Sequence, residues 1–412
     1  MDPRGIRINE KRFWSTLMRS SEIGPGTAGG LRRLALSDTD REMRDQFVSW
    51  CKDAGCAVTI DQAGNIFARL EGREKLPPVA MGSHLDTTAF GGRFDGILGV
   101  LSGLEVIRTL QDKGFKPKRP IEVINWSNEE GVRFPVYMSG SLVFSGQRPI
   151  EWLYSLTDGN GLTFGDELRR IGYAGDVPAG SKYFDTYFEL HIEQGPILYE
   201  ADIPVGIVVG GAFVRGLSVS FQGQTAHSGG TPMNRRANAL VGAAKFITTI
   251  NDIGWKFTPM GRTTATWIKV WPNKRAAIPG YVEVMVDMRH QDPTETNQMY
   301  QEVIKAVNQC AWEARLDFKI HEEWTFGGNL HFDLDCIACL RNSAKVLNVP
   351  AMDLYSQAGH DAYFISQVAP TAMIFCPCVD GLSHNEAENI IPEQTWPSVN
   401  VLLQAVLTRA ER

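Results

Sequence analysis

Two hydrophobic patterns alternate along this chain. In its outer parts, short apolar segments typical of strands are separated by segments whose apolar positions recur with the period of a helix, such as residues 96–110. The first fifty residues favour helix, and Ser37 followed by Asp38 is a suitable cap for a helix that ends at Gly55. Strands that alternate with helices predict an α/β domain with helices on both faces of a mostly parallel sheet. The strand candidates are residues 57–60, 65–70, 78–83, 121–127 and 188–193.

The middle of the chain has a different pattern of polar and apolar residues. Segments that alternate polar and apolar residues predict about four strands, with two long helical patterns among them. Those helices are expected to begin near Thr231-Pro232 and Asp292-Pro293, because a Thr or Asp cap is often followed by proline at the first helical position. Beyond this α+β region the α/β texture resumes and closes with a helix near 393–411. We therefore predict one domain from 1–212 plus 327–412, with 213–326 inserted into it.

Composition excludes several kinds of partner. The 412 residues carry 41 Lys and Arg against 47 Asp and Glu, a net charge of −6 without a basic cluster, so we expect no nucleic-acid partner. The longest apolar run, 204–214, is much shorter than the roughly 20 residues of a membrane-spanning helix, and we expect no membrane association. The N-terminus lacks the apolar segment of a secretion signal, and seven irregularly spaced cysteines favour a reducing compartment. These features predict a cytoplasmic protein.

Histidines and carboxylates follow several predicted strands. The carboxyl ends of parallel strands meet at one edge of a sheet, so these side chains are expected to converge there. Imidazole and carboxylate groups suit a divalent ion such as zinc, and one carboxylate can bridge two ions about 3.5–4 Å apart. A glutamate left over could take a proton from water. The candidates are His84, Asp86, Asp95, Glu129, Glu130, His191, Glu193, Gln194 and His384.

Taken separately, each of these motifs also has an ordinary structural interpretation. The Glu129-Glu130 pair could be a solvated surface, the segment around Asp95 a simple turn, and a histidine at the end of a strand a hydrogen-bonded structural residue. Their shared position after strands and their matching donor chemistry favour the metal site.

The motifs together resemble a known family. The segments GSHLDT, GGRFDGILGV, SNEEGVRF, ELHIEQG, AHSGGTPM, DMRH, AGHDA and GLSHNEAE are similar to those of hydantoinase/carbamoylase amidases of the M20 metallopeptidase clan. That family includes N-carbamoyl-L-amino-acid hydrolases, yeast-type β-ureidopropionases, and allantoate and ureidoglycolate amidohydrolases. The resemblance spans nearly the whole chain. It implies an M20-type catalytic domain with an inserted lid, and ELHIEQG separates this group from M20 exopeptidases.

The resemblance also implies a centre of two metal ions and a general base. Zinc is the first expectation for the ions, with manganese, cobalt or nickel as alternatives, since the same ligands serve all of them. Asp86 would orient the His84 ring as a carboxylate partner, or alternatively cap a local turn. The remaining roles are His84 and His191 on one ion, Glu130 and His384 on the other, Asp95 between them, and Glu129 as the base.

The lid is implied to contribute to substrate binding and to form a homodimer. His227 matches the histidine that stabilises the developing oxyanion when the lid closes. Arg289 matches the arginine that binds a substrate carboxylate, although such a residue could also be a surface salt-bridge partner. Gln194, Gly359 and His360 match contacts to a small-molecule amide substrate.

Two departures from the family pattern concern the substrate. Ala276 stands where the family usually has a substrate-binding asparagine, and Gln357 stands where glycine is commoner. From the resemblance we expect a metal-dependent amidohydrolase of linear amides. Its first expected substrate is an N-carbamoyl amino acid (an N-carbamoyl-L-amino acid or N-carbamoyl-β-alanine). Allantoate, ureidoglycolate and other small amides stay open as alternatives. An M20 dipeptidase or aminoacylase is disfavoured by ELHIEQG, and a non-catalytic binding module by the complete ligand set.

Overall fold

The computed structural model describes residues 5–328 and 330–412. Residues 1–4, where the first predicted domain and the segment checked for a secretion signal begin, lie outside the described residues, as does residue 329. The chain divides into two compact units. The first runs up to Val209 and includes Phe332–Leu354 and His360–Arg412; the second comprises Gly210–His331 and Tyr355–Gly359.

The first unit is built on a sheet of eight strands in the order β1-β2-β4-β3-β5-β14-β6-β13. The four adjacent strands β4, β3, β5 and β14 run parallel, and antiparallel pairs flank them on either side. Every residue of those four strands is buried, as expected for parallel strands covered on both faces. The strands are β1 (Ala57–Ile60), β2 (Ile66–Leu70), β3 (Val79–His84), β4 (Ile121–Trp126), β5 (Thr186–Ile192), β6 (Val205–Gly211), β13 (Ala351–Ser356) and β14 (Thr371–Cys376).

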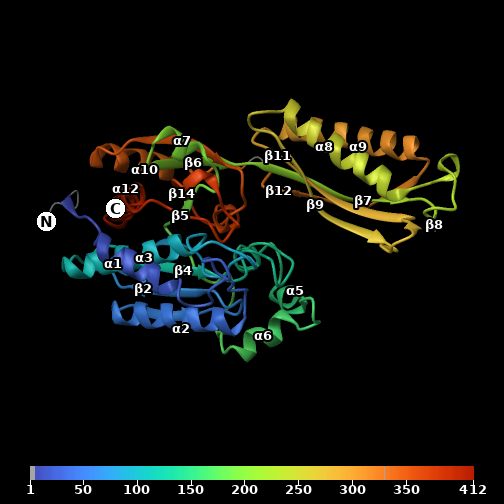
Figure 1. Ribbon diagram of the computed structural model, residues 1–412. Coiled ribbons are helices and arrows are strands. Elements are labelled where there is room, and N and C mark those ends of the chain that lie inside the picture. Colours follow the sequence, from blue (N-terminus) through green and yellow to red (C-terminus); the bar gives the residue numbers. More distant parts are fainter. Residues whose placement is uncertain (1–4, 329) are drawn as a thin grey trace. The chain divides into compact units, whose positions relative to one another are not determined.

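Helices cover this sheet. Helix α3 packs against β3, β4 and β5, and α12 packs against β5 and β14. In Figure 1, α1 and α3 lie on one side of β2 and β4, and α2 lies on the other. The helices of this unit are α1 (Glu10–Ser20), α2 (Asp38–Asp53), α3 (Ile97–Asp112), α4 (Ser139–Phe144), α5 (Ile150–Ser155), α6 (Phe164–Arg170), α7 (Ile197–Ala201), α10 (Leu334–Leu347), α11 (Asp361–Ile365) and α12 (Pro392–Ala410).

The second unit is an antiparallel sheet in the order β12-β7-β11-β9, with two long helices on one face (Figure 1). Buried and half-buried residues alternate along its strand β11. The buried side chains Val282, Val284, Val286 and Met288 form a core with α8 and α9. Strands β8 and β10 form a separate short ladder. The elements are β7 (Phe213–Gln222), β8 (Ala226–His227), α8 (Ala239–Lys256), β9 (Arg262–Trp271), β10 (Ala277–Ile278), β11 (Tyr281–His290), α9 (Pro293–Ala314) and β12 (Asp317–Phe326).

The predicted helix boundaries are partly right. Ser37 caps α2 and Asp292 caps α9, each through its side-chain oxygen. The helix predicted near Thr231-Pro232 is wrong in its start: α8 begins at Ala239, because the side chain of Asn238 accepts from the backbone N–H of Leu240 and caps the helix there.

The prediction that the first fifty residues are helical throughout is also wrong. Residues 21–37 are not helical, and this segment contains Pro25 and four glycines. The second unit begins three residues before the predicted insertion, at Gly210, and also includes Tyr355–Gly359, which no local pattern indicated.

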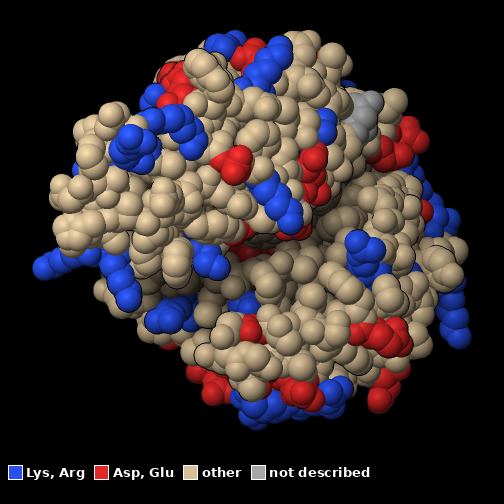
Figure 2. Space-filling view, turned by 90° about the vertical axis from the view of Figure 1, so that its right-hand side faces the viewer, with Lys and Arg blue, Asp and Glu red and all other residues tan. Residues whose placement is uncertain are grey.

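Figure 2 shows the charged side chains on one face of the molecule. On the face drawn in Figure 2, acidic and basic side chains are interspersed among uncharged residues. None of the helices in the described part of the chain combines the length and apolar character required to cross a membrane.

Candidate metal centre

Four neighbouring parallel strands deliver the predicted site residues to one edge of the sheet. His84 is the last residue of β3, and the Glu129-Glu130 pair follows β4 directly. His191 is near the end of β5, and His384 lies on the loop that follows β14. Since these four strands are adjacent and parallel, their carboxyl ends meet, which is where α/β sheets bind ligands.

Asp95 reaches the same edge from the turn before α3. Gly96 caps that helix with a φ of 70°, and a Cβ on this glycine would lie 2.3 Å from the His84 ring. A side chain is therefore excluded at position 96 both by backbone conformation and by space. This glycine allows the turn to bring the Asp95 carboxylate close to His84 and His191.

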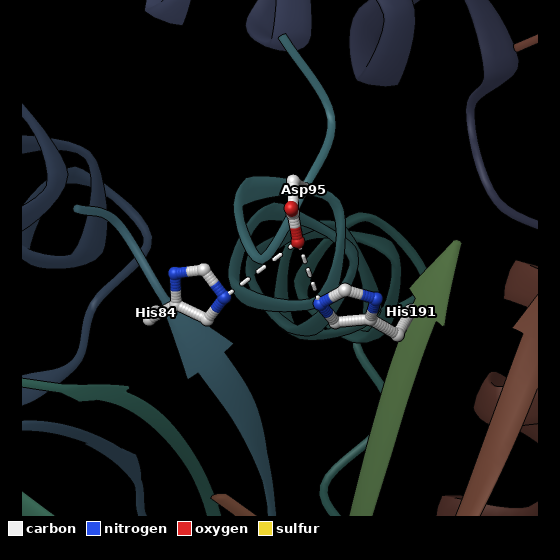
Figure 3. A group of neighbouring side chains, drawn as sticks. All are labelled: His84, Asp95 and His191. Atoms are coloured by element: carbon white, nitrogen blue, oxygen red, sulfur yellow. Dashed lines mark ion pairs between the residues drawn. The ribbon is translucent and has the colours of Figure 1, made fainter. Parts of the chain in front are cut away.

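The two oxygens of Asp95 face different donors. Its Oδ1 lies 3.1 Å from His191 Nε2 and 3.8 Å from His84 Nε2 (Figure 3). Its Oδ2 lies 3.2 Å from Nε2 of His384, and the same nitrogen is 3.5 Å from Glu130 Oε2. The structure therefore gathers the five predicted ligands into two groups that share Asp95. Such a division is what a carboxylate between two ions requires.

The imidazole tautomers suit metal binding. Nδ1 of His84 lies 2.9 Å from the backbone oxygen of Asp86, and Nδ1 of His191 lies 3.0 Å from that of Ile192. A ring whose Nδ1–H donates to a carbonyl presents a lone pair at Nε2. These nitrogens face the Asp95 carboxylate, so a cation that replaces the proton on Nε2 would be bound by imidazole and carboxylate together. The residues present therefore fit a pair of divalent ions.

Burial and charge set the protonation of these ligands. Burial lowers the pKa of His84 to about 4, so its ring is neutral near pH 7. Burial also acts to raise the pKa of Asp95, but hydrogen bonds from His191 and His384 outweigh it and hold that pKa well below its ordinary value. Burial raises the pKa of Glu129 well above normal, and the charges of Asp361 and Glu130 add to this. A site so rich in buried carboxylates is electrostatically suited to cations.

The Asp86 carboxylate does not bind the His84 ring, its predicted partner. Its carboxylate accepts the backbone N–H groups of Glu129 and Glu130, each at 3.2 Å. The contact with His84 runs through the backbone oxygen of Asp86 instead. The expectation of a carboxylate–imidazole pair is therefore corrected: Asp86 caps the turn that presents Glu129 and Glu130, because its side chain points away from its own strand end toward that of β4.

The turn after β4 is fixed by further contacts. Asn128 has a φ of 53°, and its side-chain amide donates to the backbone oxygens of Phe134 and Val136. The backbone oxygen of Glu129 accepts from Met138 N–H at 2.7 Å. Oε2 of Glu129 then lies 3.6 Å from Nε2 of His84. Glu129 belongs to neither shared ligand group, which leaves its carboxylate available for proton transfer.

Gln194 contacts the centre directly. Its side-chain nitrogen donates to Asp95 Oδ2 at 3.0 Å and to the Ser383 hydroxyl at 3.3 Å. Its backbone has a φ of 56°, as His384 has one of 53°, and a left-handed conformation is uncommon for either residue type. Such strained residues cluster where a site requires a defined side-chain direction.

Behind the centre lies a buried layer that contains the predicted residue His360 and two carboxylates that the sequence analysis did not identify. The His360 ring packs edge-on against that of His191, with centroids 4.5 Å apart. Glu189 is fully buried and accepts the Ser83 hydroxyl at 2.8 Å and the Ala362 N–H at 2.8 Å. Glu189 and His191 are two residues apart on one strand and share a face, which is the signal that could have identified it. Asp361 is also buried and accepts the Ser141 hydroxyl.

The remaining predicted residues belong to the second unit. Nδ1 of His227 accepts the backbone N–H groups of Gly229 and Gly230, so the neutral ring carries its proton on Nε2. Arg289 is bound by Asp287 through Nε at 2.7 Å and Nη2 at 3.1 Å, and its Nη1 donates to the backbone oxygen of Gln357. Ala276 has a φ of 63° and accepts from Ser228 N–H. Gly359 lies in the segment Tyr355–Gly359.

Known proteins resemble this chain over its full length. The pattern of Peptidase family M20/M25/M40 matches residues 80–408. An N-carbamoyl-L-amino-acid amidohydrolase from Rhizobium meliloti is 41% identical over 406 residues, covering 98% of this chain and 97% of that protein. A ureidoglycolate hydrolase from Arabidopsis thaliana is 31% identical, covering 93% and 83%. The crystal structure of a hydantoinase/carbamoylase family amidase from Burkholderia vietnamiensis is 44% identical, with a TM-score of 0.92 and 99% of each chain covered.

The chain belongs to peptidase family M20/M25/M40. Solved structures that it resembles over 99% of its length include hydantoinase/carbamoylase amidases, which confirms the family predicted from the motifs and the α/β fold class. The expectation of a hydrolase of C–N bonds other than peptide bonds is likewise confirmed by these relatives.

Proposed function

We propose that this protein is an N-carbamoyl-amino-acid amidohydrolase that uses two divalent metal ions. The observation that supports it most is the division of Asp95 between two donor groups, His84 with His191 and Glu130 with His384. The substrate class is taken from the relative that is 41% identical over nearly the whole of both chains. Zinc is the first candidate for the ions, with manganese, cobalt or nickel as alternatives.

The proposed chemistry assigns separate tasks to the ions and to the protein. When bound, the ions polarise the amide carbonyl and acidify water. Glu129 takes the proton of the attacking water at its carboxylate and returns it to the leaving nitrogen as the C–N bond breaks. For an N-carbamoyl substrate the products are the amino acid, ammonia and carbon dioxide. Burial of Glu129 strengthens this exchange, because a desolvated carboxylate holds a proton readily.

The second unit supplies two groups suited to this substrate. His227 has its proton on Nε2, which makes it a donor for the oxygen of the tetrahedral intermediate. Arg289 is held in a fixed orientation by Asp287 and by the Gln357 carbonyl, and a guanidinium is the natural partner of a substrate carboxylate. We assign Gln194, Gly359 and His360 to the surroundings of the substrate on the strength of the family motifs.

A second candidate is ureidoglycolate or allantoate as substrate. Ala276 is adjacent to Ala277, which pairs with His227 across the β8–β10 ladder. The backbone oxygen of Ala276 accepts from the N–H of Ser228, the residue after the proposed oxyanion donor, and alanine has no side-chain group for the polar contact of the family asparagine. Ureidoglycolate hydrolases are also among the relatives.

A substrate panel tests this assignment. We expect ammonia release from N-carbamoyl-L-amino acids or N-carbamoyl-β-alanine, and a rise in KM of at least about tenfold on Arg289→Ala, because a charge-assisted hydrogen bond contributes roughly 1.5–3 kcal/mol. For an amide without a carboxylate, the same variant should leave KM unchanged. Faster turnover of ureidoglycolate or allantoate would favour the second candidate. Bound metal without turnover of any linear amide would refute both and favour a binding module.

We also propose that the second unit forms a homodimer. Strand β9 lies at the edge of its sheet, and Trp267, Ile268 and Trp271 on this strand are exposed. Helix α8 packs against β9 and exposes Leu240 and Val241. An unpaired edge strand with exposed large apolar residues is a surface that a second copy can cover by strand pairing.

Charge placed on this edge is expected to separate the copies. The double variant Ile268→Glu, Trp271→Glu should weaken dimerisation by at least about 30-fold, since central aromatic residues of an interface often contribute 2 kcal/mol or more. Light scattering after gel filtration would then report 45.7 kDa in place of twice that mass. Trp312→Glu on α9 is the control, because Trp312 is exposed but lies on the other helix. A monomeric unsubstituted chain would contradict the proposal.

We place the enzyme in the cytoplasm. All seven cysteines are free and buried, which fits a reducing compartment.

A further inference from the structure

The loop that carries His384 also carries a buried carboxylate with no assigned role, that of Glu388. It is 1% exposed. Its Oε1 accepts the backbone N–H groups of Phe94 at 3.0 Å and Asp95 at 3.1 Å. Its Oε2 accepts the hydroxyl of Ser383 at 2.8 Å. One carboxylate therefore joins the backbone of the Asp95 turn to the residue that precedes His384.

The Asp95 turn is shaped to receive this carboxylate. A Cβ on Gly92 would lie 2.0 Å from the carboxyl carbon and Oε1 of Glu388. No side chain could occupy position 92 while Glu388 holds its present place. The glycine-rich turn before α3 thus has two close approaches, Gly96 to His84 and Gly92 to Glu388.

The His384 side of the centre is the more exposed one. The His384 side chain is 53% exposed, whereas that of Asp95 is 4% exposed. Its backbone φ of 53° is unfavourable for a residue with a Cβ. Ser383 Oγ lies 3.4 Å from Asp95 Oδ2. The hydrogen bond between Ser383 and Glu388 therefore also helps to position the Asp95 oxygen that faces His384. On the opposite side, His84 and His191 are buried and lie on or beside strands of the central sheet.

We propose that Glu388 is a positioning residue that sets the spacing between Asp95 Oδ2 and His384 Nε2, and thereby the affinity for the ion held by Asp95, Glu130 and His384. The ion held by His84, His191 and Asp95 depends on it less, because two of its three protein ligands, His84 and His191, are fixed by the sheet. This inference rests on the two-ion centre of the proposed function and adds a residue that selects between its two positions.

Metal stoichiometry is the direct test. Apo protein is titrated with Zn²⁺ and, separately, Mn²⁺, and bound metal is counted by mass spectrometry after desalting. We expect two ions in the unsubstituted chain and one in Glu388→Ala, with affinity for the second ion lowered about 10- to 100-fold, as for other partners that orient metal ligands. Glu388→Gln retains an oxygen that can accept both N–H groups, so it should recover most of the second ion. If the alanine variant does not fold, Glu388→Gln is compared with the unsubstituted chain: a weaker affinity for the second ion alone supports the proposal, and an unchanged affinity or a loss of both ions overturns it.

Glu386 provides a matched control on the same loop. Its carboxylate also accepts two backbone N–H groups, those of Ala28 and Gly30, and the hydroxyl of Thr27, and these donors belong to a segment other than the Asp95 turn. Glu386→Ala should retain both ions. The proposal is overturned if Glu388→Ala binds two ions normally, if it loses both together, or if Glu386→Ala loses the same ion. An unsubstituted chain that binds no ion would instead refute the proposed function, and this inference with it.

Discussion

Replacing Glu129 with glutamine should lower kcat by about 10²- to 10⁴-fold, the usual contribution of a general base, while both metal ions stay bound. The substitution keeps the size of the side chain and removes only its capacity to take a proton. The turn should persist, because the contact of residue 129 with Asp86 is made by the backbone N–H. Steady-state kinetics on an N-carbamoyl amino acid, together with metal analysis of the same sample, measures both effects.

The neighbouring residue provides the contrast for this experiment. Glu130→Gln should lose the ion shared with His384, because Glu130 Oε2 faces His384 Nε2. If Glu129→Gln retains activity, the assignment of the base is wrong. If instead it loses metal as Glu130→Gln does, Glu129 is a ligand and the proton is handled by another group.

Replacing Asp95 with alanine is expected to remove both ions and with them all measurable hydrolysis. Asp95 is the one carboxylate that both donor groups share, so its loss leaves His84 with His191, and Glu130 with His384, as incomplete pairs. Ligand linkage adds a second measurement. Free metal at about 100 times Kd should stabilise the unsubstituted chain by about 2.7 kcal/mol per ion, and should leave Asp95→Ala unchanged.

His384→Ala is the partial counterpart of this variant. It should retain the ion on the His84 side and lose the other, because only the second group contains His384. An Asp95→Ala protein that still binds two ions, or whose unfolding temperature still rises with added metal, would contradict the shared role of Asp95.

The sequence pattern predicted the strands well because each central strand is buried on both faces and has turn residues at its ends. The strand-end motifs also identified the five converging donors, since neighbouring parallel strands bring their carboxyl ends together whatever the loops between them do. The start of α8 was mispredicted because two local caps, Thr231 and Asn238, compete. Pro232 has an extended backbone, and the residues after it form only a single 3-10 turn, Met233–Arg235.

The partners of carboxylates could not be predicted in the same way. Asp86 follows His84 by two residues, yet its side chain bonds to a turn more than forty residues away. Glu386 and Glu388 have the same residue type and loop, yet only Glu388 enters the Asp95 turn. Side-chain direction on a loop depends on which backbone N–H groups other segments leave unpaired. The residues next to it in the sequence do not indicate which groups these are.

The sequence by itself determined the family, the α/β class and the candidate donors, because these depend on periodicity and on residue types at the ends of strands. Tertiary structure alone decided how the donors divide around Asp95, which tautomer each histidine presents, and that Glu388 joins two distant turns. These properties depend on distances of 3–4 Å between atoms far apart in the chain, and such distances are set only when the sheet is assembled.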